Sequence, residues 1–265
     1  MSKFIFDEQK NDEKIINSCK FDGISIQSMI KKLAKYNFYV KNMDDFKNRE
    51  AIIGYMQQHS YGFATVDWDE TIENAIKNCK KYQYKKVDSI KITKQELDFI
   101  GLFNDIKKEK VLFVMLCLAK YNHYYNKSNN FWVNSSASLI FKEARVHIKS
   151  VERLGFLREL YLAGAYDLVN GTGSASKRIT FVSECSDDDV VLELGENDFE
   201  ELAYTYLFYK DGFSGYIHCE KCGKLTKQKS NRQKFCAVCA KESKKASTKE
   251  SDLRRYEKIR KLGIC

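Results

Sequence analysis

Four cysteines near the C-terminus stand in two closely spaced pairs. Cys219 and Cys222 enclose two residues and are followed by Gly223, and after 13 intervening residues Cys236 and Cys239 enclose two more. Two cysteines three positions apart can present both sulfurs to one ion, and a glycine after the second lets the backbone turn back. Two such pairs supply the four thiolates of a tetrahedral zinc site. We therefore predict that Cys219, Cys222, Cys236 and Cys239 hold one structural Zn²⁺ ion.

A site closed by four thiolates leaves no coordination position for a substrate, so we interpret it as structural and not catalytic. A thioredoxin-like redox pair would need a βαβ setting, which the surrounding sequence lacks. A two-iron cluster is the other alternative and is uncommon at this spacing. His218 directly precedes the first cysteine, and we interpret it as an ordinary neighbour because four thiolates already satisfy the ion.

Positive charge is concentrated around these cysteines. The chain has 45 Lys and Arg against 36 Asp and Glu, and the segment Cys219–Cys265 holds 15 and 5 of them, which leaves 30 and 31 elsewhere. The entire excess therefore lies on the cysteine segment and its tail, a distribution that predicts a polyanionic partner. The predicted phosphate contacts are Lys224, Lys227, Lys229, Arg232 and Lys234 between the pairs, and Arg254, Arg255 and Lys258 beyond them.

The elements that would hold these residues follow from the same segment. Lys224–Lys234 suits a short β-hairpin, and the second cysteine pair opens a long polar helix, Ala237–Leu262. A knuckle, a hairpin and a helix that supplies the last two ligands resembles a treble-clef zinc finger.

The middle of the chain alternates between helical and strand periodicity. Apolar residues at three- and four-residue steps predict helices over Glu109–Asn126, Ser135–Ala144 and Lys149–Ala163. Short strands are predicted at 131–133, 165–169, 178–182 and 190–194, and a further helix at Asp198–Tyr209. In the helix Lys149–Ala163 the residues expected to face inward are Val151, Leu154, Leu157, Leu160 and Tyr161.

This order of elements resembles a winged helix-turn-helix domain over residues 108–183. In DNA-binding members the third helix enters the major groove and the hairpin wing lies along the backbone. The resemblance implies DNA contacts from Lys149, Arg153 and Arg158 on the helix, and from Lys177 and Arg178 on the wing. Winged helices also serve as protein-interaction modules. Glu152, Glu159 and the acidic run Asp187–Asp189 keep that alternative open.

The N-terminal third predicts a small helical region without a chemical site. Residues 1–20 are polar, with a short strand indicated at Phe4–Phe6. Helices are expected over Ile24–Tyr39, over Asp44–Gln57 with Phe46 inward, and over Trp68–Lys81 with Asp67 as cap. Thr93 and Glu96 form a capping box for a helix starting at Lys94.

The fold class expected is therefore mainly α with small β hairpins (α+β). A helical N-terminal region spans 1–92, a winged-helix-like domain spans 93–210, and a four-cysteine finger with a basic helix spans 211–265.

Taken together, the pattern resembles uncharacterised phage and mobile-element proteins of low-GC Gram-positive bacteria. The residues that carry this resemblance are Val111–Tyr121, Phe131–Asn134, Ile140–Ala144, Cys219–Gly223 and Phe235–Cys239. The resemblance implies a fold and a genomic setting but no catalytic residue.

The function expected is nucleic-acid binding, with DNA favoured over RNA, in a regulatory or replication-type protein. The alternative is an interaction protein that inhibits a host or defence complex, including one that contains RNA. We found no histidine pair with metal-hydrolase spacing, no phosphate-binding Walker loop and no nucleophile elbow, so no enzyme activity is expected. No small-molecule substrate or membrane is expected, and the charged start Met1–Lys14 together with scattered cysteines predicts a cytoplasmic protein of the bacterial host.

Overall fold

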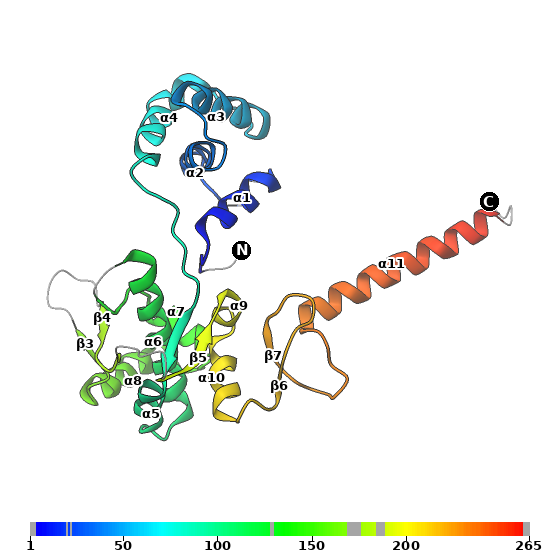
Figure 1. Ribbon diagram of the computed structural model, residues 1–265. Coiled ribbons are helices and arrows are strands. Elements are labelled where there is room, and N and C mark those ends of the chain that lie inside the picture. The colour runs from blue at the N-terminus through cyan, green and yellow to red at the C-terminus, as the bar shows by residue number, and fades with distance from the viewer. Residues whose placement is uncertain are drawn as a thin grey trace. The chain divides into compact units, whose positions relative to one another are not determined.

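The computed structural model describes residues 4–19, 21, 23–127, 130–168, 176–183 and 189–261, the last five of these by backbone only. Within these residues the chain forms eleven helices and three small antiparallel sheets (Figure 1). The predicted class, mainly α with small β elements, is therefore confirmed. The chain divides into two compact units, one formed by Ile5–Asp88 and one by Ser89–Cys265 together with Met1–Phe4. None of the described helices is both long and apolar enough to cross a membrane.

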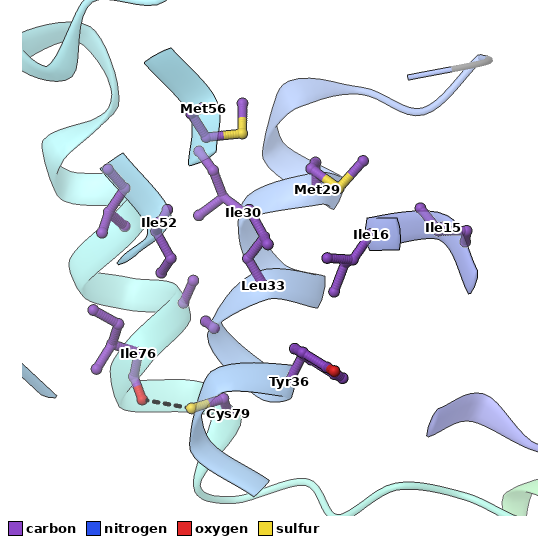
Figure 2. Close-up of a cluster of buried hydrophobic side chains, with 13 residues drawn as sticks. Ile15, Ile16, Met29, Ile30, Leu33, Tyr36, Ile52, Met56, Ile76 and Cys79 are labelled. Carbon is purple, nitrogen blue, oxygen red and sulfur yellow. Dashed lines mark hydrogen bonds between the residues drawn. The ribbon is translucent and has the colours of Figure 1, made fainter. Parts of the chain in front are cut away.

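The unit Ile5–Asp88 consists of α1 (Glu8–Ser18), α2 (Ile26–Tyr39), α3 (Asp45–His59) and α4 (Thr65–Cys79). Helix α2 lies at its centre and packs against the other three. Met29, Ile30 and Leu33 of α2 are buried together with Ile52 and Met56 of α3 (Figure 2). This core belongs to the unit alone, and it places no cluster of chemically reactive side chains among the residues described.

Polar side chains also take part in this core. Asn37 Nδ2 donates to Asn48 Oδ1 at 3.1 Å, and Asn48 Nδ2 donates to the carbonyl oxygen of Ala34 at 2.9 Å. Both asparagines are buried, so a sliding of α2 along α3 would leave amide groups without partners. The pair therefore fixes the register of the two helices.

Several predictions for this unit were wrong. Residues 4–6 form no strand, and the polar segment after them is α1, whose N-cap Asp7 accepts from the Lys10 N–H. Helix α4 begins at Thr65, so Asp67 lies in its first turn and does not cap it. Phe46 is 70% exposed because α3 faces α2 with the stripe formed by Asn48, Ile52 and Met56 instead.

The larger unit is built around one helix that is buried on every side. Its first elements are β1 (Ile90–Thr93), α5 (Lys94–Gly101) and α6 (Ile106–Asn126). Every residue of α6 from Val111 to Tyr121 is buried. An all-round apolar helix is typical of the centre of a domain, and α6 packs against α5, β2, α7 and α10.

Two of the three antiparallel sheets pack against α6. Strand β1 pairs with β5 (Val190–Leu194), with Ile90 opposite Leu194. Strands β2 (Trp132–Val133), β4 (Lys177–Ile179) and β3 (Tyr166–Leu168) form a sheet in that order. Between β2 and β3 the chain forms α7 (Ala137–Glu143) and α8 (Ser150–Leu162). The third sheet pairs β6 (Tyr216–His218) with β7 (Leu225–Lys227) and belongs to the cysteine segment.

Two helices differ from the sequence prediction. The predicted helix Asp198–Tyr209 is two helices, α9 (Glu196–Phe199) and α10 (Leu202–Lys210), which break at Glu200 and Glu201. In α8, Leu157 and Leu160 are buried as expected, but Val151 is 82%, Leu154 is 76% and Tyr161 is 41% exposed. Helix α8 contacts β3 along a narrow stripe, so the rest of its apolar face remains at the surface.

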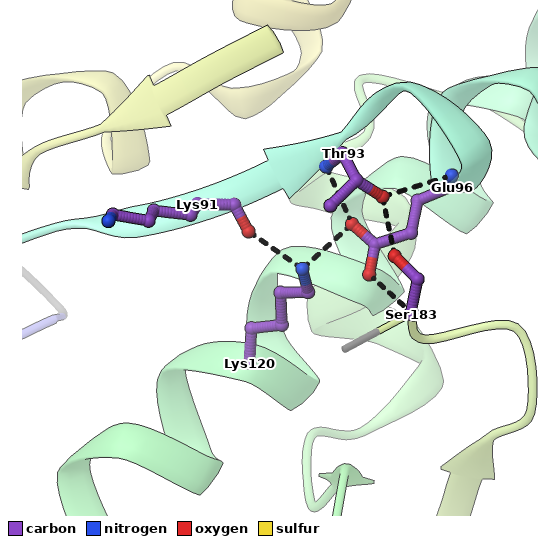
Figure 3. Close-up of polar contacts among 5 residues, drawn as sticks. All are labelled: Lys91, Thr93, Glu96, Lys120 and Ser183. Carbon is purple, nitrogen blue, oxygen red and sulfur yellow. Dashed lines mark hydrogen bonds and ion pairs between the residues drawn. The ribbon is translucent and has the colours of Figure 1, made fainter. Parts of the chain in front are cut away.

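A buried ion pair connects β1, α5 and α6 (Figure 3). Lys120 Nζ lies 2.7 Å from Glu96 Oε2 and donates to the carbonyl oxygen of Lys91 at 2.7 Å. The same carboxylate accepts from the Thr93 N–H at 2.9 Å and from the Ser183 N–H at 3.1 Å. The predicted capping box of Thr93 and Glu96 is present, and Glu96 additionally neutralises a buried lysine.

Candidate metal centre and basic surface

The first cysteine pair lies in the turn between β6 and β7. The Gly223 N–H donates to the Cys219 carbonyl at 2.8 Å, and the Cys219 N–H donates to the Lys224 carbonyl at 2.9 Å. Gly223 has φ of +72°, which glycine adopts without strain. The prediction of a hairpin within Lys224–Lys234 is therefore wrong. The knuckle itself reverses the chain, so the strand before Cys219 pairs with the strand after Cys222.

The second cysteine pair lies at the start of α11 (Ala237–Lys261). Cys236 directly precedes the helix and Cys239 lies in its first turn, where the Cys239 N–H donates to Cys236 Sγ at 3.5 Å. The four sulfurs lie within 4.8 Å of one another, and Cys222 Sγ is 3.8 Å from Cys236 Sγ. The predicted clustering of Cys219, Cys222, Cys236 and Cys239 is confirmed. The four sulfurs are close enough to bind one metal ion.

The environment of the sulfurs favours thiolate at one position. Burial raises the pKa of Cys219, but N–H groups of Cys236, Cys222 and Lys221 donate to its sulfur and bring the pKa to about 6. Burial raises the pKa of Cys222. A soft set of four cysteine sulfurs suits Zn²⁺ or an iron–sulfur centre.

The finger is held against α9 and α10. A Cβ atom added to Gly223 would lie 2.6 Å from Nδ2 of Asn197 in α9, so the backbone approaches that side chain directly. Lys224 forms an ion pair with Glu200 at 2.6 Å, and Leu225 is buried. The His218 ring lies beside Phe208 of α10, and its Nδ1 is 3.1 Å from the Gly223 carbonyl oxygen. His218 therefore faces the backbone and stands outside the sulfur group, as expected.

The predicted phosphate contacts of the finger fall into two groups. Lys224 pairs with Glu200, and Lys234 pairs with Glu220 at 3.4 Å. Lys227, Lys229 and Arg232 are exposed, and no ion pair joins them to an acidic side chain among the described residues.

Helix α11 carries a second group of basic residues on one face. Lys241, Lys244, Lys245 and Lys249 recur at steps of one to four residues and line a shallow surface depression together with Tyr256. We refer to these four lysines as the α11 basic face. Two nearby acidic residues pair elsewhere, Glu242 with Lys221 at 2.9 Å and Glu250 with Arg254 at 2.5 Å, whereas Asp252 lines the depression with the lysines. Arg255 is exposed, and the side chain of Lys258 lies outside the described residues.

The candidates in the middle of the chain are less uniform. Lys149 and Arg158 are exposed, and Arg153 Nη1 donates to Ser138 Oγ at 2.9 Å. Arg178 pairs with Asp167 at 2.7 Å. Lys177 is only 7% exposed, and burial lowers its pKa. Residues 169–175 of the expected wing loop, together with Asp187 and Asp188, lie outside the described residues.

One cavity brings together candidates that are far apart in the sequence. A cavity of about 910 Å³ is lined by Lys149 and Arg153 from the start of α8 and by Lys224 from the finger. Lys142 and Arg145 at the end of α7 line it as well, and sequence reasoning missed both. The one feature that marks these two residues is the turn between α7 and α8. Arg145 adopts φ of +49° there, which ends α7 and turns the chain toward α8. We refer to this as the α8 cavity.

Comparison with protein-family models, curated proteins and solved structures finds no match to this chain.

Proposed function

We propose that this chain is a zinc-containing, DNA-binding protein of the regulatory or replication type, encoded by a phage or mobile element. The identity of the metal is inferred from the chemistry of its ligands. Four thiolates in two knuckles form a closed soft-ligand set, for which Zn²⁺ is the usual ion, and no open position is left for catalysis. The ion would hold β6, β7 and the start of α11 as one rigid finger.

We further propose that residues 106–180 are a winged helix. The element order α6, β2, α7, α8, β3, β4 and the sheet order β2–β4–β3 support this assignment. In that arrangement α8 is the helix that enters the major groove. Arg158 and Lys149 are the exposed basic residues it offers, whereas Lys177 is buried and Arg178 is paired with Asp167.

The DNA-binding proposal rests mainly on the exposed positive charge of α11. The helix has 25 residues and a length of about 37 Å at 1.5 Å per residue. Among its side chains from Ala240 to Tyr256, all are exposed except the half-buried Ser243, so no apolar core holds it. Glu242 and Glu250 are paired off, and Asp252 is the single acidic residue that lines the depression with the four lysines, so the α11 basic face keeps an excess of positive charge that a phosphate backbone can neutralise.

The test is the salt dependence of binding of the zinc-loaded full chain to duplex DNA. Neutralising Z phosphates makes log K fall against log salt with a slope of roughly −0.9Z. Replacing Lys241, Lys244, Lys245 and Lys249 together by alanine is expected to reduce that slope by roughly three to four units. A variant in which four exposed lysines outside the finger, Lys31, Lys77, Lys81 and Lys94, are replaced by alanine removes the same number of charges and is the matched control, which should keep the wild-type slope.

Two results would contradict this proposal. Binding that does not respond to salt would exclude phosphate contacts, and an unchanged slope in the four-lysine variant would remove α11 from the interface. RNA of equal length, measured in the same series, decides between the two nucleic acids, because a preference for RNA would reassign the partner.

A second candidate function has its own supporting observation. Val151, Leu154 and Leu162 are exposed on α8, and Leu168 of β3 is 46% exposed. Apolar side chains gathered at a surface favour a protein partner, as expected of an interaction protein that inhibits a host or defence complex. Replacing Val151 and Leu154 by serine should leave DNA binding unchanged if α8 contacts protein, and weaken it if α8 lies in the groove.

A further inference from the structure

The α8 cavity has the charge and the donors of an anion site. Five Lys or Arg residues and three Glu residues line it. Two of the glutamates are already neutralised, since Glu201 pairs with Arg145 at 2.5 Å and Glu200 pairs with Lys224 at 2.6 Å. Lys142 and Lys149 are exposed at the rim, and no ion pair joins either to an acidic residue in the part of the chain that the structure describes. The cavity is therefore electropositive.

Arg153 supplies a fixed donor inside the cavity. Its Nη1 donates to Ser138 Oγ at 2.9 Å, and its guanidinium lies 5.7 Å from the centre of the Phe141 ring. Its Nε is buried and has no hydrogen-bond partner among the described residues. An N–H without an acceptor is uncommon in folded proteins, so Arg153 has a hydrogen-bonding group that its protein neighbours leave unused.

The start of α8 borders the same cavity. Ile148 and Lys149, the two residues before the helix, line the cavity. No side chain caps the first turn of this 13-residue helix, because its N-cap position is occupied by Lys149, which cannot accept a hydrogen bond. The Glu152 carboxylate accepts from the Lys149 N–H at 3.3 Å and does not line the cavity. The positive end of the helix dipole therefore favours an anion beside Lys149.

We infer that the α8 cavity binds a phosphate group through Arg153, Lys142, Lys149 and the start of α8. The nucleic-acid backbone is the source that fits best, because the cavity also contains Lys224 and so lies between α8 and the finger. A volume of about 910 Å³ accommodates a sugar–phosphate and not only a bare anion. This inference rests on the proposed DNA-binding function, and it adds a specific phosphate pocket to a surface otherwise defined by charge.

The experiment uses the zinc-loaded full chain and two probes, inorganic pyrophosphate and duplex DNA. Arg153→Lys keeps the charge but loses Nε and the guanidinium fork, and is expected to weaken pyrophosphate binding about tenfold by calorimetry. The double variant Lys142→Ala with Lys149→Ala is expected to do the same and to reduce the DNA salt slope by about two units. A double variant of exposed lysines outside the cavity, Lys77→Ala with Lys94→Ala, is the matched control and should change neither pyrophosphate binding nor the DNA salt slope.

The outcomes separate this inference from the proposed function. Pyrophosphate binding and a DNA salt slope that are both unaffected by the cavity variants would overturn the inference while DNA binding stands. Loss of pyrophosphate binding in the variants of a protein that binds no DNA would support the pocket, assign it to a free phosphate compound and overturn the DNA proposal. Unfolding curves of each variant establish that the fold is retained, and Arg153→Lys provides the readout if the double variant fails to fold.

Discussion

At the scale of single residues, the ion pair between Glu96 and Lys120 shows how buried charges are satisfied in this protein. Glu96 and Lys120 are both fully buried, and each has its hydrogen-bonding groups satisfied by the other and by the backbone of β1 and Ser183. The capping role of Glu96 follows from its distance of three residues from Thr93. Its pairing with Lys120, 24 positions away, does not follow from any local pattern, because a lysine in an apolar helix is ordinarily expected to reach the surface.

The replacement Lys120→Met is therefore expected to lower the free energy of unfolding by about 3–5 kcal/mol, because it leaves the Glu96 carboxylate buried without its cation. The double replacement Lys120→Met with Glu96→Gln should recover much of that loss, since the neutral amide still caps α5. Urea denaturation of the full chain measures both. Equal losses in the single and double variants would mean that the charge of Glu96 is not what Lys120 stabilises.

At the scale of elements, sequence patterns among adjacent residues correctly predicted several helices and strands. The β5 strand appears at the predicted residues, and α6 and α11 lie within three residues of prediction, because periodicity and the cysteine spacing are properties of adjacent residues. Helix α1 was missed because its buried side, Asp12, Ile15 and Ile16, is largely masked by charged neighbours. The exposure of Val151 and Leu154 could not be predicted, because it depends on which face of α8 meets β3.

The junction of the finger with α9 provides a test at the same scale. Gly223→Ala places a side chain at φ of +72° and against Asn197, so it is expected to destabilise the finger by about 1–3 kcal/mol. Adding Asn197→Ala should relieve the contact but not the backbone strain, and so restore only part of the loss. Gly155→Ala in α8 is the control, since open space surrounds that position and alanine favours a helix by about 0.5–1 kcal/mol. Resistance of the bound metal to a chelator reports on the finger in each variant. A Gly223→Ala protein as resistant as the wild type would show that the close approach to Asn197 is not required.

At the scale of the whole molecule, the cysteine cluster and the N-terminal core are separate buried clusters. The buried cluster of the finger consists of its cysteines with Phe235, whereas the unit Ile5–Asp88 has an apolar core of its own. The cysteine site was predictable in full because its ligands come from two local pairs. The α8 cavity was not, because it assembles residues from α7, α8, α9 and the finger.

Metal removal is accordingly expected to unfold the finger and to leave the Ile5–Asp88 core intact, because metal binding supplies the folding free energy only of the segment it holds. Metal analysis should find one zinc ion in the wild type and in Cys19→Ser, whose cysteine is exposed and outside the cluster, and none in Cys236→Ser. NMR spectra before and after chelation would resolve the two sets of signals. Zinc retained by Cys236→Ser would contradict the four-cysteine assignment. Iron found in place of zinc would show that the site holds an iron centre instead.

The burial of Phe4 gives the chain an order of assembly. Phe4 packs against Tyr121 and Phe199, so the larger unit contains residues from both sides of Ile5–Asp88. During synthesis the Ile5–Asp88 core can close as soon as its residues leave the ribosome, since it needs nothing that follows. Phe4 must wait until residue 199 has been made. Phe4, the first described residue, thus reaches its native place only after a long stretch of later chain, and the nascent chain keeps that aromatic ring exposed until then.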